Sequence, residues 1–76
     1  MKRLVVNMLQ IMEAGGRVTG TQANKLLGSG NVYSAVKRGW LRRIRVDAHR
    51  VDYQITERGK RYVMDTLLEE VERAVG

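Results

Sequence analysis

The side chains best suited to chemistry in this chain are four arginines in one short stretch: Arg42, Arg43, Arg45 and Arg50. A guanidinium group donates two parallel hydrogen bonds to a phosphate, so a run of arginines suits a phosphate backbone. Apolar and polar residues alternate over 42–56, which predicts a two-stranded hairpin that turns around residues 47–50. The same period of two places Arg43 and Arg45 on one face of a strand, as a positive strip.

The alternative for these arginines is an ordinary solvated face, and Asp47 and Asp52 are near enough to pair with some of them. His49 falls at the tip of the hairpin, where we expect an ordinary turn residue. The alternation predicts one polar face, carrying the charges, and one apolar face on the hairpin. The residues expected on the apolar face are Ile44, Val46, Val51, Tyr53 and Ile55.

Helical periodicity predicts three helices before the hairpin. The first covers residues 2–14, where six apolar side chains share one face, and two consecutive glycines end it. The second covers about 21–27, with Thr19 or Thr21 as its cap and a glycine at its end. The third runs from a cap at Asn31 to about residue 38. Residues 17–19 are too short for an independent strand, but they can add an edge to a small sheet.

The second and third helices form a helix-turn-helix pattern. A short turn of three to four residues, containing Gly30, is expected between them. In such a motif the outward side chains of the third helix lie at base edges in the major groove, and the second helix crosses the phosphates. Asn31 can pair with adenine, although a pure capping role is the alternative. Tyr33 suits a phosphate or a thymine methyl group, with a partly buried core ring as its alternative.

Two stretches resemble the winged helix-turn-helix family. Thr21-Gln-Ala-Asn-Lys-Leu-Leu-Gly28 and Asn31-Val-Tyr-Ser-Ala-Val-Lys-Arg-Gly-Trp-Leu41 look like that family's positioning helix, recognition helix and exit to the wing. Tyr53-Gln-Ile-Thr-Glu-Arg-Gly59 is similar to the Tyr-x-Leu-Thr-x-x-Gly signature that closes the wing in many small bacterial and archaeal regulators. Together they cover most of the chain. The recognition helix is about a turn shorter than in most regulators of this kind.

The resemblance implies an α+β winged helix fold in a single domain over residues 1–76. A three-helix core, a two-stranded β wing and a long C-terminal helix at 57–75 are its expected parts. It implies a transcriptional regulator that binds double-stranded DNA, with the wing on the backbone or in the minor groove. The contacts expected from the two helices are those of Thr21, Gln22, Lys25, Asn31, Tyr33, Ser34, Lys37 and Arg38.

Two aromatic residues flank the wing and are expected in the core. Trp40 stands between the recognition helix and the wing, where it would fix the angle between them, and Tyr53 lies on the second strand. Arg58, Lys60 and Arg61 fall in the first turn of the last helix, where positive charge opposes the helix dipole. Their placement suggests a functional reason, such as a phosphate contact or an acid on a partner subunit.

The last helix carries an apolar stripe whose spacing approximates a coiled-coil seam. We expect Tyr62 and Val63 to face the domain's own core and the stripe to form a two-fold homodimer. Such a dimer would present two recognition helices to a palindromic site. The alternative is that the helix packs back on the first helix of its own chain. The stripe consists of Met64, Leu67, Leu68, Val71 and Val75.

Charge is segregated along the sequence. The net charge is +6 overall, but residues 1–61 hold thirteen Lys and Arg against four acids, and residues 62–76 hold one against four. A basic body with an acidic last helix indicates two different partners. Seventy-six residues suffice for one small core, and the absence of cysteine fits a reducing compartment. No secretory or membrane-spanning segment is recognisable, so a cytoplasmic, nucleoid-associated protein is expected.

Catalysis is the least favoured class. There is no Cys and only one His, and no nucleotide-binding glycine-rich loop is present. No acid–base pair or metal-ligand cluster is visible, so we expect no metal, no cofactor and no enzymatic activity. The first hypothesis is therefore a sequence-specific, dimeric regulator of transcription. The alternatives are an architectural protein that coats DNA with little sequence preference and a winged helix that binds a protein.

Overall fold

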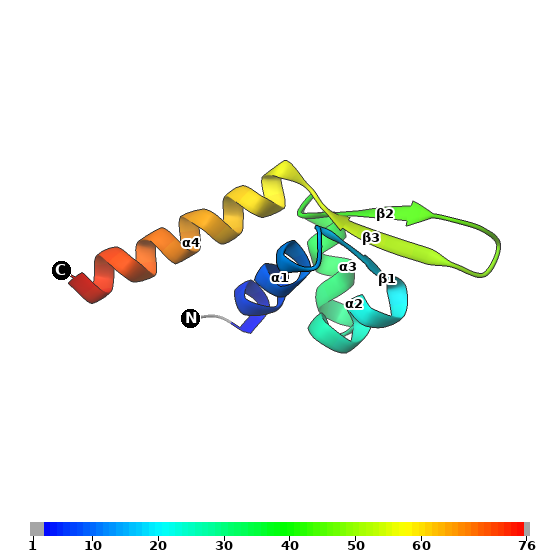
Figure 1. Ribbon diagram of the computed structural model, residues 1–76, viewed down its shortest axis with the longest axis horizontal. Helices are drawn as coiled ribbons and strands as arrows, with labels where there is room; N and C mark the ends of the chain where they lie inside the picture. Colours follow the sequence, from blue (N-terminus) through cyan, green and yellow to red (C-terminus); the bar gives the residue numbers. More distant parts are fainter. Residues whose placement is uncertain (1–2, 76) are drawn as a thin grey trace.

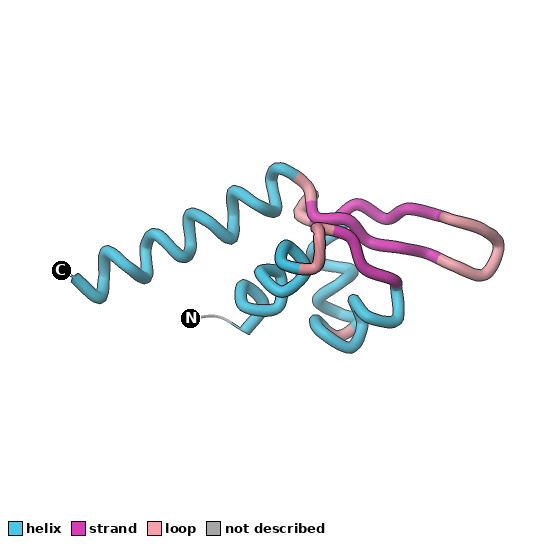
Figure 2. Tube along the Cα trace, in the orientation of Figure 1, coloured by secondary structure: helices cyan, strands magenta, loops and turns pink. Residues whose placement is uncertain are grey.

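The protein is a small α+β domain of four helices and a three-stranded antiparallel sheet (Figure 1). The computed structural model describes residues 3–75. Helices α1, α2 and α3 gather at one end of the sheet, whereas the hairpin and α4 extend in opposite directions (Figure 2). The elements are α1 (Arg3–Glu13), β1 (Arg17–Thr19), α2 (Gly20–Leu27), α3 (Ser29–Lys37), β2 (Leu41–Arg45), β3 (Val51–Ile55) and α4 (Glu57–Val75).

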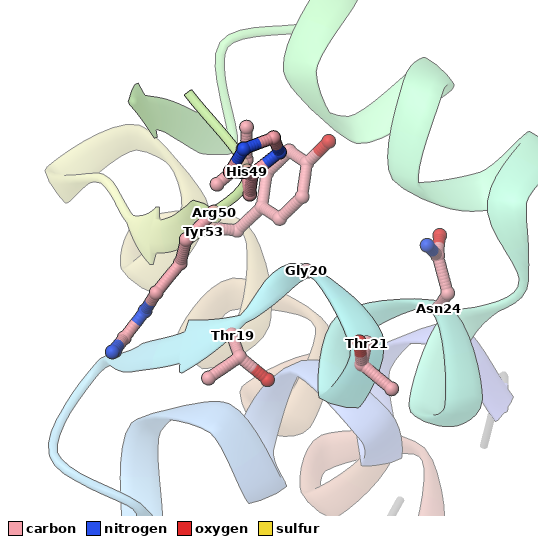
Figure 3. Close-up of a pocket in the computed structure, with 8 residues that line it drawn as sticks. Thr19, Gly20, Thr21, Asn24, His49, Arg50 and Tyr53 are labelled. Carbon is pink, nitrogen blue, oxygen red and sulfur yellow. The ribbon is translucent and has the colours of Figure 1, made fainter. Parts of the chain in front are cut away.

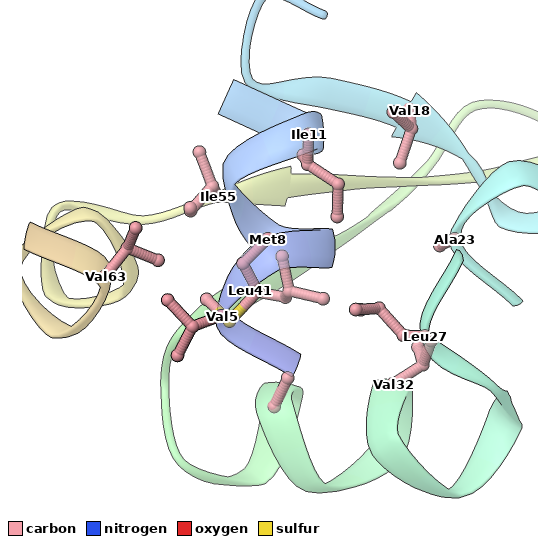
Figure 4. Packing of buried hydrophobic residues seen from close by; sticks show 11 residues of the cluster. Val5, Met8, Ile11, Val18, Ala23, Leu27, Val32, Leu41, Ile55 and Val63 are labelled. Atoms are coloured by element: carbon pink, nitrogen blue, oxygen red, sulfur yellow. The ribbon is translucent and has the colours of Figure 1, made fainter. Parts of the chain in front are cut away.

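The core lies between the three short helices and the sheet (Figure 4). Helix α1 contributes Val5, Met8 and Ile11, which recur every third residue and therefore share one face of the helix. All three are fully buried. Val63 completes this core from α4, as the sequence predicts. The remaining buried apolar residues are Val18, Ala23, Leu27, Val32, Ala35, Leu41 and Ile55.

The sheet has the strand order β1-β3-β2, so the short strand β1 is an edge strand, as predicted. The expected apolar face of the hairpin is wrong for Ile44. This residue pairs with the buried Asp52, while Arg43 pairs with Tyr53. A turn of four residues would have placed Ile44 opposite Tyr53. The connection contains five, because Val46 belongs to it, and one extra residue moves each side chain of a strand to the opposite face relative to its partner strand.

Helices α2 and α3 are closer in sequence than predicted. Thr19 caps α2, and the Thr19 and Gln22 side chains each bond the other residue's backbone N–H, at 3.2 Å. Only Gly28, with a φ of +86°, separates the two helices. The predicted turn of three to four residues is therefore wrong, and so is the cap at Asn31. Helix α3 begins at Ser29, and the Asn31 side-chain amide donates to the Leu27 carbonyl at 2.7 Å.

One hydroxyl group joins the end of α3 to the start of α4. The Thr56 hydroxyl oxygen lies 2.5 Å from the Gly39 carbonyl and 3.1 Å from the Trp40 carbonyl, and it accepts the Gly59 N–H at 3.0 Å. Gly59 is buried, and a Cβ at this position would lie 2.3 Å from the Trp40 carbonyl oxygen. The Thr-x-x-Gly sequence is thus explained by a side-chain cap and a close backbone approach.

Most of α4 lies away from the core. Of its 19 residues only Gly59 and Val63 are buried, and Leu67 is half-buried against the core. The helix continues outward, which gives the molecule a longest dimension of 50 Å against 22 and 21 Å (Figure 1). Within residues 3–75 no helix is long and apolar enough to cross a membrane.

Candidate nucleic-acid interface

Helix α3 presents a polar surface opposite its buried side. Val32 and Ala35 are buried, and Val36 is half-buried against the core, as the sequence predicts. On the helical wheel, Gly30, Tyr33, Ser34 and Lys37 lie opposite these positions, and all four are exposed. Tyr33 keeps 70% of its surface accessible, which excludes the partly buried core ring considered for it. We call these four residues the α3 stripe.

Two adjoining hollows separate the β2–β3 hairpin, which we call the wing, from helices α2 and α3. The first, of about 310 Å³, lies between Tyr33 of α3 and Arg43 and Tyr53 of the wing. The second, of about 610 Å³, lies between the start of α2 and the tip of the wing (Figure 3). Asn24 and Tyr53 line both hollows, so the two form one continuous concave surface. We call it the wing groove.

The sheet register decides which wing arginines belong to the wing groove. Arg43 pairs with Tyr53 and Arg45 with Val51, and paired residues of antiparallel strands project from the same face. Tyr53 and Val51 both line the groove. Arg43 and Arg45 therefore share the groove face. Their predicted common face is confirmed, but the prediction that it is the polar face, opposite Tyr53 and Val51, is wrong. Arg42, paired with Gln54, projects from the opposite face.

Arg50 is held by an acid. Its Nε donates to Asp52 Oδ1 at 3.0 Å, and Arg17 Nε donates to Asp52 Oδ2 at 3.0 Å. In Figure 3 the Arg50 side chain extends away from Asn24 and the α2 side of the wing groove. Asp52 is only 3% exposed, so two guanidinium groups compensate a buried carboxylate. The alternative that Asp52 pairs with a wing arginine is thus confirmed for Arg50. Asp52 also pairs with Arg17, a partner that sequence reasoning missed.

Asp52 joins β1 to the wing through Arg17 and Arg50, and the strength of these ion pairs depends on pH. The hydrogen bond from Arg50 lowers the pKa of Asp52 below its usual range; burial opposes this effect, and the bond from Arg17 adds to it. A carboxyl whose pKa is lowered by folding stabilises the native state above its unfolded pKa, about 3.9, and loses this contribution as pH falls through the folded value.

We therefore expect Asp52→Asn to lower the melting temperature at pH 7 and the gap to wild type to narrow as pH falls below about 4. Thermal unfolding followed by circular dichroism between pH 2.5 and 7 measures this. Asp47→Asn is the matched control, because Asp47 is exposed and its carboxylate accepts only the backbone N–H of His49 within the described residues. A gap between Asp52→Asn and wild type that stays constant over this range contradicts the assignment.

The predicted contacts on α2 are at the surface. Thr21, Gln22 and Lys25 are exposed, and Thr21 lines the wing groove. The Gln22 side-chain oxygen is already used by the α2 cap, which leaves its amide nitrogen for other contacts. Asn24 lines the groove as well, and sequence reasoning did not single it out. Its exposed position three residues after Thr21 places it near the same face of α2, a signal available from helical spacing.

Arg38 and Trp40 lie at the other end of α3. The Trp40 ring stacks on Tyr62 with centroids 3.9 Å apart and planes 10° apart, and the Arg38 guanidinium carbon lies 5.2 Å from the Trp40 ring centroid. Trp40 and Tyr53 pack against the core but remain half-buried, so the expected core placement holds in part. Trp40 contacts α4 through Tyr62 and follows α3 directly.

The apolar stripe predicted on α4 separates into two parts. Leu67 packs against the core of its own chain. The other four residues stay exposed, with accessible fractions of 55–84%. They are Met64, Leu68, Val71 and Val75. The alternative in which the whole helix packs back on α1 therefore applies only to its first half. Among the described residues no group of three or more His, Cys, Asp or Glu gathers at a potential metal site.

Comparison with known proteins identifies a family for this chain. No curated protein and no solved structure matches the chain. The DUF3860-like family matches residues 6–66, which run from the first turn of α1 to the first half of α4. The matched region contains the α3 stripe, the wing groove and the Thr56–Gly59 junction. By this match over most of its length, the chain belongs to the DUF3860-like family.

Proposed function

We propose that this protein is a winged helix domain that binds double-stranded DNA without catalysis. The observation that carries the proposal is the shared face of Arg43 and Arg45 beside α3. Both arginines project toward the wing groove, and Tyr33 of the α3 stripe borders the same groove. A duplex seated there would meet polar side chains from a helix and guanidinium groups from a hairpin together.

The α3 stripe is the part suited to the major groove. An α-helix fits the width of that groove, and its exposed side chains reach base edges. Ser34 and Tyr33 are the proposed base-reading residues, and Lys37 is a proposed phosphate contact. Asn31 stands to the side of the stripe, and its amide is bonded to the Leu27 carbonyl, so we give it a smaller part in readout.

The exposed half of α4 supports a homodimer. Four apolar side chains on a projecting helix form a surface that a second copy of the chain would cover. Two copies related by a two-fold axis would present two α3 stripes to a palindromic site. The resulting function is sequence-specific regulation of transcription, with the protein associated with the nucleoid. The second candidate, an architectural protein, is favoured by the exposed arginines of the wing, because contacts to phosphates carry no sequence information.

The experiment is a titration of the full chain with random-sequence duplex DNA at 50 and 200 mM salt, together with selection from a random pool. Binding through about five phosphates predicts a log–log salt slope near −4.5. We expect this steep slope and enrichment of a palindromic motif. A steep slope without enrichment favours the architectural candidate. Absence of binding at 50 mM salt contradicts both, and points to a protein partner for the basic surface.

A further inference from the structure

A second group of cations lies where α3 ends and α4 begins. Lys37 and Arg38 come from the end of α3, and Arg58 and Arg61 from the first turns of α4. All four are exposed and line one shallow hollow of about 580 Å³ that is wide open to solvent. The stacked Trp40 and Tyr62 rings also line it. We call these four cations the junction cluster.

Among residues 3–75, no acid forms an ion pair with a member of the junction cluster. The ion pairs of the described residues use Arg17, Arg50 and Lys60, and none involves a member of the cluster. Asp65 lines the same hollow, but no cluster member is within ion-pair distance of it. Four like charges around one concavity repel one another. This repulsion is added to the unfavourable interaction of Arg58 and Arg61 with the dipole of α4.

The geometry holds these charges in place. Thr56 ties the start of α4 to the carbonyls of Gly39 and Trp40, so the two elements that carry the cluster cannot separate independently. The Arg38 guanidinium rests over the Trp40 ring, which orients it without an acid. A polyanion at the hollow would therefore meet four cations whose backbone positions are fixed relative to one another, with the Arg38 guanidinium already oriented.

We propose that the junction cluster binds the phosphate backbone of the same duplex, beyond the end of the α3 stripe. This rests on the proposed function. Lys37 belongs to both the stripe and the cluster, so the two surfaces are continuous along α3. The duplex then follows a path from the wing groove over α3 to the start of α4. The arginines of α4 add phosphate contacts that carry no sequence information.

The test compares charge removals on one helix. The double variant Arg58→Gln, Arg61→Gln removes two proposed contacts, whereas Arg73→Gln removes an exposed charge on the same helix, about 18 Å beyond Arg61. Each lost phosphate contact reduces the magnitude of the log–log salt slope by about 0.9. We expect a reduction of about 1.8 for the double variant on a fixed 24-base-pair duplex. The expected change for Arg73→Gln is below about 0.3.

Trp40 supplies a second measurement that does not depend on affinity. It is the only tryptophan, and it lines the same hollow as the junction cluster. Iodide quenches its fluorescence in the free protein, and the four cations raise the local iodide concentration. Saturating duplex should reduce the quenching constant at least twofold for wild type. The wing variant Arg43→Ala should show the same reduction of its quenching constant once it is saturated with duplex, because its junction cluster is intact.

The outcomes separate this proposal from the proposed function. Absence of duplex binding by wild type overturns both. Wild-type binding with an unchanged salt slope in the double variant, and unchanged iodide quenching at saturation, overturns the junction cluster alone. Circular dichroism melting of each variant shows whether the fold is retained, and the quenching of wild type remains decisive if the double variant does not fold.

Discussion

Replacing Gly59 with alanine will lower the stability of the folded state by about 2–4 kcal/mol, the cost of forcing extra volume into a close-packed site. The added Cβ would lie 2.3 Å from the Trp40 carbonyl oxygen and 2.9 Å from an Ile55 side-chain carbon. The Trp40 carbonyl is part of the backbone and cannot rotate away as a side chain can, so α4 must move away from Trp40. In a domain of this size each kcal/mol shifts the melting temperature by about 4–8 °C, so the expected decrease is at least about 8 °C.

Gly30→Ala is the matched control for this prediction. It is also a helical glycine, but a Cβ there would meet no atom within 4 Å. Alanine should stabilise the protein by about 0.5 kcal/mol, because the unfolded chain loses conformational freedom. Chemical denaturation of both variants measures the two effects with opposite signs. Equal stability of Gly59→Ala and wild type would show that α4 does not approach Trp40 as closely as described.

Removing Arg43 and Arg45 together will weaken duplex binding by about 10- to 100-fold at 150 mM salt, as expected for two lost phosphate contacts. Both project toward the wing groove. Neither is paired with an acid within the described residues, so alanine at these positions leaves no buried charge unpartnered. The fold should therefore persist, and thermal melting checks this.

Arg42→Ala is the control on the same strand. It removes the same charge from an exposed position, but on the opposite face of the sheet. We expect its affinity for duplex DNA to fall less than about threefold, from the loss of long-range attraction alone. Fluorescence anisotropy with one labelled duplex gives both values. If Arg42→Ala weakens binding as strongly as the double variant, the wing contributes only net charge, and the wing groove is not the binding surface.

Periodicity in the sequence predicted the elements themselves. The stripe of α1, the edge strand β1 and the hairpin were all recognisable, because buried faces recur with the period of a helix or strand. Thr19 and Gly28 marked the ends of α2 correctly. The predicted cap of α3, Asn31, lies three residues after the observed cap, Gly28, since Ser29 and Gly30 are typical turn residues and nothing local shows that Gly28 alone completes the turn.

Contacts between distant segments were harder to predict. The faces of the hairpin depend on whether Val46 belongs to a strand or to the turn, and hydrophobicity favours the wrong choice. The ion pair of Arg17 with Asp52 joins residues 35 apart, so no local spacing indicates it. The junction cluster depends on how α4 leaves the sheet. The sequence indicates a role for each of its members separately, but their shared hollow is a property of the tertiary fold.

The Thr56 junction fixes the orientation of α4 relative to α3. One hydroxyl and one glycine fix the direction in which α4 leaves the end of α3. Because each helical residue turns about 100° and advances 1.5 Å, inserting one residue near Leu67 would rotate the distal face without moving α3. The number of residues in α4 thus determines the direction in which its exposed apolar face points relative to the α3 stripe.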